Sequence, residues 1–444
     1  MRRARPVDLL LLAAVAAIGL VAMPTRAEAA LAAVIQPGSV GRSSLALDAT
    51  YSTNLHIGWS LRRITVDSIA SIRNTSGGPI DRVELNTIAA KIGALRGLSV
   101  TVEGVSVAAR ISDQTIVVPL GGILPVGGSI RVRTRYSATL RSGTSGSDWL
   151  FTRTNDIASI YRWVPWVSRA TAFARTNPGD PFVTPSSRSV RVRIWADRAL
   201  VYATTGRQIA ADATSRTFLA ANVRDFTVTA SPSYRIATGT VGMTTVVGYA
   251  RTASVARAFR DQGVRFLRRY ESLLGPYPWS NYRVVQSSGG FAMESPNLVW
   301  IPYGVASSRI PYLVAHETAH QWFYSMVGND QAREPFTDEA AADFLARYVL
   351  GTRRASRCST GYLDRTIYEY TNACYFERIY IQGGNLIDDA RRRIGSTRFW
   401  GAMRDYVTAE RFKLAHERTL LNALDAATSL DLSTTFRPRF PRYY

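Results

Sequence analysis

Two of the chain's four histidines stand four residues apart, in the motif His316-Glu317-Thr318-Ala319-His320. In an α-helix, residues i and i+4 share a face, so both imidazoles can bind one metal ion. Glu317 lies between them, where its carboxylate can act as general base on a water at the metal. The motif therefore predicts a hydrolytic metal centre. The alternative is a helix whose two histidines only pack.

A catalytic zinc site needs a third protein ligand and an open fourth position. Eighteen residues lie between His320 and Glu339. This length lets a first helix end at Gly328 and a second, antiparallel helix present a carboxylate near its start, so we predict Glu339 as the third ligand. Asp343 lies one turn further on, where it either holds a ligand histidine through its free N–H or is a solvated acid.

The pattern HExxH, eighteen residues, then Glu resembles that of the gluzincin metallopeptidases, and residues 314–348 resemble the aminopeptidase N family in particular. The segment Gly289-Gly290-Phe291-Ala292-Met293-Glu294-Ser295 is similar to that family's Gly-x-Met-Glu-Asn substrate strand. Tyr380-Ile381-Gln382-Gly383 is similar to its Tyr-x-Lys-Gly motif, which carries a catalytic tyrosine. The resemblance extends more faintly over most of residues 45–440.

This resemblance implies a zinc peptidase with one Zn²⁺ per chain and peptides as substrates, although cobalt or manganese can replace zinc in the test tube. Glu317 would take a proton from the zinc-bound water and return it to the leaving amine, and Tyr380 would help zinc to stabilise the oxyanion. Glu294 would pair with the free α-ammonium of the substrate, which makes removal of N-terminal residues the expected reaction. The backbone of residues 289–292 would pair with the peptide as an edge strand, so the implied substrate-binding residues include Gly290, Phe291, Ala292 and Met293.

Three positions depart from the family motifs. This sequence has Phe291 where the family motif prefers glycine, Ser295 where it has asparagine, and Gln382 where it has lysine. None of them is a zinc ligand or the base, so they bear on specificity more than on catalysis. The sequence ends at Tyr444, and we expect a short form without the C-terminal helical domain of larger members. The more open cleft that would result favours an alternative function, a zinc endopeptidase or oligopeptidase.

Two halves of the chain must position these residues. Residues 43–242 alternate apolar and polar side chains between Gly, Pro and Ser turns, which is typical of antiparallel β-structure. From about residue 251 the apolar spacing becomes helical. We predict an all-β domain over residues 30–242 and a thermolysin-like, mainly helical α+β catalytic domain over 243–444. The expected helices cover residues 310–327, 336–350, 383–394 and 397–407, and one strand covers 282–286.

Residues 1–29 have the pattern of a signal peptide: an arginine-rich start, fifteen apolar residues over 9–23, and the cleavage motif Ala27-Glu28-Ala29. We predict a protein secreted after cleavage, with no stable membrane insertion. The alternative is a retained N-terminal anchor. In an oxidising compartment Cys358 and Cys374 are expected to form a disulfide rather than two free thiols.

The composition, 46% hydrophobic and 20% charged residues, is that of a folded globular protein. The net charge of +21 comes from arginines spread along the whole chain. Because there is no basic run and no nucleic-acid motif, we predict no nucleic-acid partner. A weak contact with anionic cell-envelope polymers is an alternative to a merely solvated basic surface. A catalytically decayed envelope-binding protein is a further alternative. The sequence does not indicate the oligomeric state.

Overall fold

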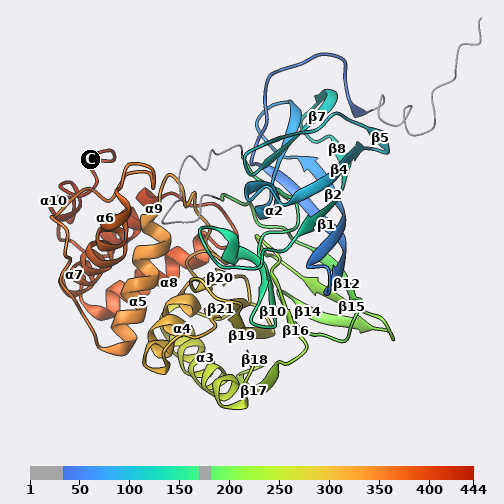
Figure 1. Cartoon of the computed structure of the whole chain (residues 1–444). Coiled ribbons are helices and arrows are strands. Elements are labelled where there is room, and N and C mark those ends of the chain that lie inside the picture. The colour runs from blue at the N-terminus through green and yellow to red at the C-terminus, as the bar shows by residue number, and fades with distance from the viewer. Residues whose placement is uncertain (1–33, 170–181) are drawn as a thin grey trace, which may run out of the picture.

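The structure, a computed structural model, describes residues 34–169 and 182–444. The predicted signal peptide lies outside the described residues. Within them the chain forms a β-rich first half and a helical second half that lie side by side, as the sequence predicts (Figure 1). No helix of this described part combines the length and the apolar character needed to cross a bilayer.

The first half is built on one large sheet and two smaller ones. The large sheet has the order β14-β15-β12-β1-β2-β8-β4-β5, and β1 pairs in parallel with β12. Its strands are β1 (Leu47–Gly58), β2 (Arg63–Asn74), β4 (Leu95–Val102), β5 (Val105–Ser106), β8 (Ser129–Thr139), β12 (Val190–Ala196), β14 (Arg207–Ala211) and β15 (Ser215–Ala220). The first four-stranded sheet has the order β13 (Val201–Thr204), β16 (Val228–Ser231), β10 (Ile157–Ile160), β9 (Phe151–Thr154). The second has the order β11 (Trp166–Val167), β3 (Ile80–Asn86), β7 (Thr115–Leu124), β6 (Arg110–Ser112).

The alternating pattern of β2 shows why this half folds as a sheet with one buried face. Ile64, Val66 and Ile72 are almost fully buried, whereas Asp67 on the opposite face pairs with Arg133 of β8. Side chains of successive residues point to opposite faces of a strand, so this period-two pattern fixes the pairing register. The apolar side chains of β2 therefore belong to the hydrophobic core of the β-rich half.

The second half begins with a five-stranded mixed sheet in the order β17-β18-β19-β21-β20. Its strands are β17 (Arg235–Val241), β18 (Thr244–Ala250), β19 (Asn281–Ser287), β20 (Met293–Ser295) and β21 (Leu298–Pro302). β17 and β18 form a hairpin around Gly242, which adopts a positive φ of 53°. The predicted boundary at 242 therefore falls inside this hairpin, and the sheet of the second half starts at Arg235.

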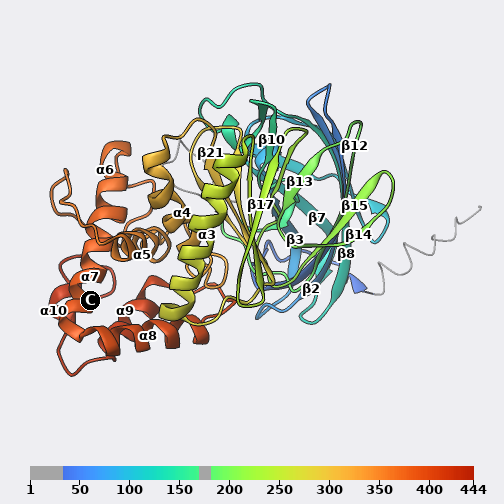
Figure 2. The ribbon, with the colours of Figure 1, turned by 90° about the horizontal axis from the view of Figure 1, so that it is seen from below.

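The helices of the second half lie on one side of this sheet, and the first two of them pack against its strands. They are α3 (Ala253–Leu274), α4 (Ile310–Ala319), α5 (Ala341–Leu350), α6 (Asn372–Phe376), α7 (Gly384–Ile394), α8 (Ser396–Ala409), α9 (Glu417–Asp425) and α10 (Ser433–Phe436), while α2 (Ile88–Lys91) lies in the first half. Figure 2 shows α3 between the sheet and the remaining helices. Gly248 of β18 permits this approach, because a Cβ there would lie 2.0 Å from the Ala256 carbonyl oxygen of α3.

Two of the predicted helices differ from the structure at the end that lies next to a predicted metal ligand. The helix predicted over 310–327 ends at Ala319, and residues 320–328 continue as turns. The helix predicted over 336–350 begins as a π-helical turn, η3 (Phe336–Ala340), before α5 starts. A second π-helical turn, η4 (Glu377–Gly383), precedes α7. The short turns η1 (Asp148–Leu150) and η2 (Ser307–Arg309) complete the helical elements of the described chain.

A buried arginine connects the two halves. The Arg224 guanidinium, 1% exposed, donates to the carbonyl oxygens of Thr184 in the first half and of Ser325, Met326 and Lys413 in the second. Burial lowers the pKa of Arg224 to about 10, so the side chain still carries its charge at neutral pH. The turns after α4 are thus held by the β-rich half.

Candidate active site

The three predicted metal ligands come together at the junction of α4 and η3. His316 lies in the last turn of α4, His320 directly follows that helix, and Glu339 lies in η3. The Nε2 atoms of the two histidines are 3.2 Å apart. The Glu339 Oε2 atom is 3.3 Å from the Nε2 of His316 and 3.5 Å from that of His320. Three donor atoms from two elements therefore face one point.

These distances fit a tetrahedral zinc site. With Zn–N and Zn–O bonds of about 2.0–2.2 Å, ligand atoms at the corners of a tetrahedron lie about 3.3–3.6 Å apart. Two imidazoles and one carboxylate are also a donor set that zinc accepts, with one corner left for water or substrate. Burial acts to raise the pKa of Glu339, but the two histidines lower it, which keeps this carboxylate ionised.

Asp338 orients His320. The Nδ1 of His320 lies 2.6 Å from the Asp338 Oδ1 and 3.0 Å from the Phe323 carbonyl oxygen. Because both neighbours are acceptors, the Nδ1 carries the proton and the Nε2 keeps its lone pair for a metal. Burial alone would lower the pKa of His320, but the charges of Asp338 and Glu294 raise it.

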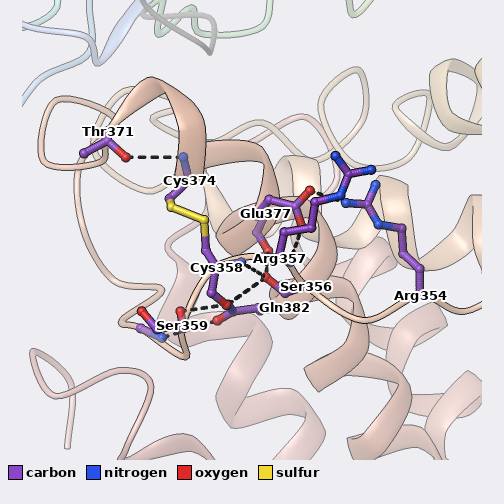
Figure 3. Close-up of a disulfide and its surroundings, with 10 residues drawn as sticks. Arg354, Ser356, Arg357, Cys358, Ser359, Thr371, Cys374, Glu377 and Gln382 are labelled. Carbon is purple, nitrogen blue, oxygen red and sulfur yellow. Dashed lines mark hydrogen bonds and ion pairs between the residues drawn. A yellow bond between two sulfur atoms is a disulfide. The ribbon is translucent and has the colours of Figure 1, made fainter.

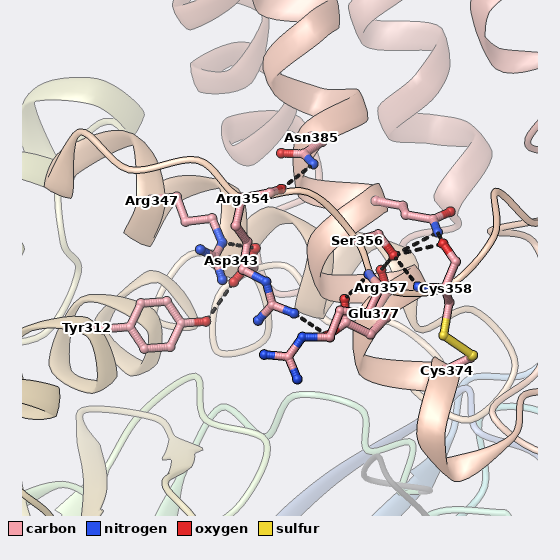
Figure 4. Close-up of polar contacts among 11 residues, drawn as sticks. Tyr312, Asp343, Arg347, Arg354, Ser356, Arg357, Cys358, Cys374, Glu377 and Asn385 are labelled. Carbon is pink, nitrogen blue, oxygen red and sulfur yellow. Dashed lines mark hydrogen bonds and ion pairs between the residues drawn. A yellow bond between two sulfur atoms is a disulfide. The ribbon is translucent and has the colours of Figure 1, made fainter.

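Asp343 does not have either of its predicted roles. It is fully buried, accepts hydrogen bonds from the Tyr312 hydroxyl at 2.6 Å and the Arg347 Nε at 2.7 Å, and has no contact with a histidine (Figure 4). The Tyr312 ring stacks beside His316, with ring centroids 5.9 Å apart. Asp338, directly before Glu339, faces His320 in place of Asp343.

Glu317 lies beside the metal ligands. It is 4% exposed, and one of its carboxylate oxygens lies within 4.8 Å of ligand atoms of Glu294 and His320. Its Oε2 makes no hydrogen bond to any described residue. Burial, aided by the carboxylates of Glu294 and Glu339, raises the pKa of Glu317, while His320 acts in the opposite direction. A buried carboxylate with an unpaired oxygen is suited to accept a proton.

Glu294 lies on β20, the edge strand of the five-stranded sheet, and is 5% exposed. The prediction that residues 289–292 form the edge strand is wrong, because Gly289 and Gly290 have φ of 142° and 84° and turn the chain away from an extended path. The strand begins at Met293 instead. A peptide added to this edge would therefore lie next to Glu294 itself.

Phe291 lies at the tip of this bend with 71% of its surface exposed. Its ring meets the edge of Trp149 from the β-rich half, with centroids 5.7 Å apart. Gly290 packs so closely on Trp149 that a Cβ would lie 2.5 Å from that side chain. The two halves of the molecule thus meet at the substrate-binding segment that the sequence predicts.

Tyr380 lies on η4, and its ring stacks on His316 with an interplanar angle of 12° and centroids 5.6 Å apart. Burial, with the nearby Glu339 carboxylate, raises the pKa of Tyr380 well above its usual value. The phenol is therefore protonated at neutral pH and able to donate a hydrogen bond.

The segment that carries Tyr380 is held by a disulfide and by side-chain hydrogen bonds. Cys374 of α6 forms a disulfide with Cys358 (Figure 3). The amide of Gln382, where the family motif has lysine, donates to the Ser356 hydroxyl and to the carbonyl oxygens of Cys358 and Ser359. Gln382 therefore anchors the loop that the disulfide closes, and this loop braces η4.

Sequence reasoning missed Asp338 and Gln331. The Gln331 Nε2 donates to Asp338 and, at 3.2 Å, to Glu294. The sequence signal for Asp338 is its place directly before Glu339. Gln331 lies within the stretch 314–348 that resembles the aminopeptidase N family, but in an irregular turn without a periodicity that would indicate its role.

Comparison with solved structures places the fold among the two-domain M1 zinc metallopeptidases, while no family model matches the sequence. A mutant M1 zinc metallopeptidase from Deinococcus radiodurans is 18% identical, with a TM-score of 0.67 over 88% of this chain and 94% of that one. A mutant from the same organism bound to the substrate Tyr-Ser-Ala is 19% identical, with a TM-score of 0.65 over 88% and 93%. A two-domain mutant bound to L-tryptophan is 18% identical, with a TM-score of 0.66 over 89% and 94%.

Proposed function

We propose that this protein is a zinc-dependent peptidase that removes residues from the N-terminus of peptides. The observation that carries this proposal is the convergence of His316, His320 and Glu339 at tetrahedral spacing, with the buried carboxylate of Glu317 beside them. The likeness of the fold to M1 zinc metallopeptidases, two of which hold a peptide or an amino acid, supports the same reaction.

Zinc held by these three residues would polarise the scissile carbonyl and lower the pKa of water toward neutrality. Glu317 accepts a proton from the attacking water, and its unpaired Oε2 is the atom available for that transfer. The same carboxyl group then returns the proton to the departing amine. Asp338 keeps the His320 Nδ1 protonated, so that ring does not change tautomer during the reaction.

Tyr380 donates its hydroxyl hydrogen to the carbonyl oxygen as negative charge develops there. Its ring stacks beside His316, so the tyrosine lies next to the proposed metal ligands before substrate arrives. A donor that is already in place has no reorganisation cost at the moment of reaction. Because the pKa of Tyr380 is raised, the phenol donates a hydrogen bond rather than carrying a charge of its own.

Glu294 binds the α-ammonium group of the substrate. It is buried at the edge strand and lies close to both Glu317 and His320. A peptide whose ammonium group pairs with Glu294 has its first peptide bond near the catalytic carboxylate, which favours removal of the N-terminal residue over internal cleavage.

We also propose that the protein is exported, on the basis of the signal pattern in residues 1–29. The Cys358–Cys374 disulfide supports this location, because disulfides persist mainly in oxidising compartments. Fractionation of the producing cells and N-terminal sequencing of the purified protein test it. A cytoplasmic protein that retains Met1 would contradict export, whereas a surface-bound protein with an intact N-terminus would indicate a retained anchor.

The test of the activity is hydrolysis of matched peptides with free or acetylated N-termini by zinc-loaded protein. Glu317→Gln and Glu294→Ala variants serve as comparisons. Cleavage confined to free N-termini, lost in Glu317→Gln and weakened in Glu294→Ala, would support the proposal. Equal cleavage of blocked peptides at internal bonds would make this an endopeptidase. Stoichiometric zinc without turnover of any peptide would point instead to a binding protein.

A further inference from the structure

One buried side chain joins the two functional parts of the site. The Gln331 side-chain amide, in a residue that is 5% exposed, donates one hydrogen bond to the Glu294 Oε1 at 3.2 Å and another to the Asp338 Oδ2. The other oxygen of Asp338 faces the Nδ1 of His320. A continuous chain of hydrogen bonds therefore runs from the proposed ammonium-binding glutamate to a metal ligand.

The residue next to Gln331 ties this turn to the β-rich half. The preceding residue, Asp330, forms an ion pair with Arg169 of the β-rich half and accepts from the Arg333 backbone. The turn that carries Gln331 is thus held by contacts outside the site. This makes Gln331 a support for Glu294 and Asp338 rather than a side chain that merely follows them.

The side-chain amide of Gln331 carries no charge, and this is important for its role. Glu294, Glu317, Asp338 and Glu339 bring four carboxylates into one buried region. An amide NH₂ group satisfies two of them with its two hydrogens and adds no charge. A lysine or arginine at the same place would pair with Glu294 and neutralise the charge that the substrate's ammonium group needs.

We propose that Gln331 is a positioning residue that selects substrates with a free, protonated N-terminus, by holding Glu294 ready for the ammonium group and coupling it to the Asp338–His320 pair. This inference rests on the proposed function, since Glu294 has that role only in an aminopeptidase. The ligand class it predicts is an unblocked peptide with a cationic α-amino group.

The experiment compares the full-length protein with Gln331→Met, which removes both donors at similar volume, and with Gln114→Met as control. Gln114 is also fully buried, but it lies in the β-rich half and its amide makes no hydrogen bond to the described residues. In Gln331→Met we expect the KM for a free tripeptide to rise about tenfold, with a smaller change in kcat. Zinc should also be lost about tenfold more readily to a chromogenic chelator. Gln114→Met should change neither quantity.

A second variant separates positioning from simple packing, and it serves if Gln331→Met does not fold. Gln331→Lys keeps a donor in place but adds a charge, so zinc retention should stay near that of the wild type while the KM rises more than tenfold. An unchanged KM in either folded variant would overturn the inference. If the wild type cleaves no free peptide, the proposed function fails, and zinc retention in Gln331→Met still decides whether Gln331 supports Asp338 and His320.

Discussion

The Oδ1 atom of Asp338 lies 2.6 Å from the Nδ1 of His320, on the side of the ring opposite the metal-facing Nε2. This pair connects the residue directly after α4 with a residue of η3. A carboxylate in this place fixes the ring orientation and raises the basicity of the Nε2. The adjacent Glu339 is the proposed third ligand, so two consecutive acids of one turn would act on the same metal ion from two sides.

Asp338→Asn is expected to lower zinc affinity by about 10- to 100-fold, because the amide is a weaker partner for the Nδ1–H than a carboxylate. The measurement is competition with a chelator of known affinity. Asp343→Asn is the matched control, since Asp343 contacts Tyr312 and Arg347 and no histidine. Equal loss of affinity in both variants would contradict the role assigned to Asp338.

Tyr380→Phe is expected to lower kcat by about 10²- to 10³-fold, the usual effect of removing one donor to a developing oxyanion. The ring stacking on His316 does not need the hydroxyl, so zinc content and KM should change little. Steady-state kinetics with zinc analysis of the same sample checks this. A wild-type kcat in this variant would show that Tyr380 is not the donor to the oxyanion.

Loss of the disulfide should destabilise the region that braces η4. A bridge across a sequence separation of 16 residues contributes roughly 3 kcal/mol to the free energy of unfolding. We therefore expect a Cys358→Ala, Cys374→Ala double variant to unfold at lower urea concentration and to be cut faster by proteases within residues 352–371. Gln382 still ties this loop to η4, so zinc content should be retained. An unchanged urea midpoint would count against the structural role of the bridge.

Acid stability should depend on Asp81. Burial acts against ionisation, but donors from the Ser39 hydroxyl and the backbone N–H groups of residues 40–42 lower the pKa of Asp81 to about 2. A carboxyl with a depressed folded-state pKa stabilises the protein above its unfolded pKa of about 3.9, and this contribution disappears as the pH falls through the folded value. Asp81→Asn should therefore be less stable than the wild type at pH 7. The difference in unfolding free energy should shrink between pH 4 and pH 2, and a difference independent of pH would contradict this account.

The proximity of the two candidate ligand histidines could be predicted from the sequence because their spacing is local. His316 and His320 lie four residues apart across the last turn of α4, and the helical periodicity alone places them together. The β-rich first half was predicted equally well, since its strands alternate with period two. Both signals depend on regular backbone geometry, which repeats along the chain.

The remaining features depend on irregular backbone. Asp338, which faces His320, lies in the π-helical turn η3, and the sequence contains no signal that distinguishes this turn from an α-helix. The bend at Gly289 and Gly290 replaces an expected strand because both residues adopt positive φ. Gln331 meets Glu294 across a sequence separation of 37 residues, a contact that only the packed structure can create.

Arg224 also bears on how the molecule folds. Its guanidinium provides the hydrogen-bond donors for carbonyl groups of Ser325 and Met326, which lie in the turns directly after His320. Buried carbonyls that lose such a donor are costly, so the peptide segment behind the metal site cannot reach its final shape before the β-rich half has formed. Unfolding should accordingly be cooperative across both halves, and the second half produced alone should behave as an incomplete folding unit rather than as a smaller enzyme.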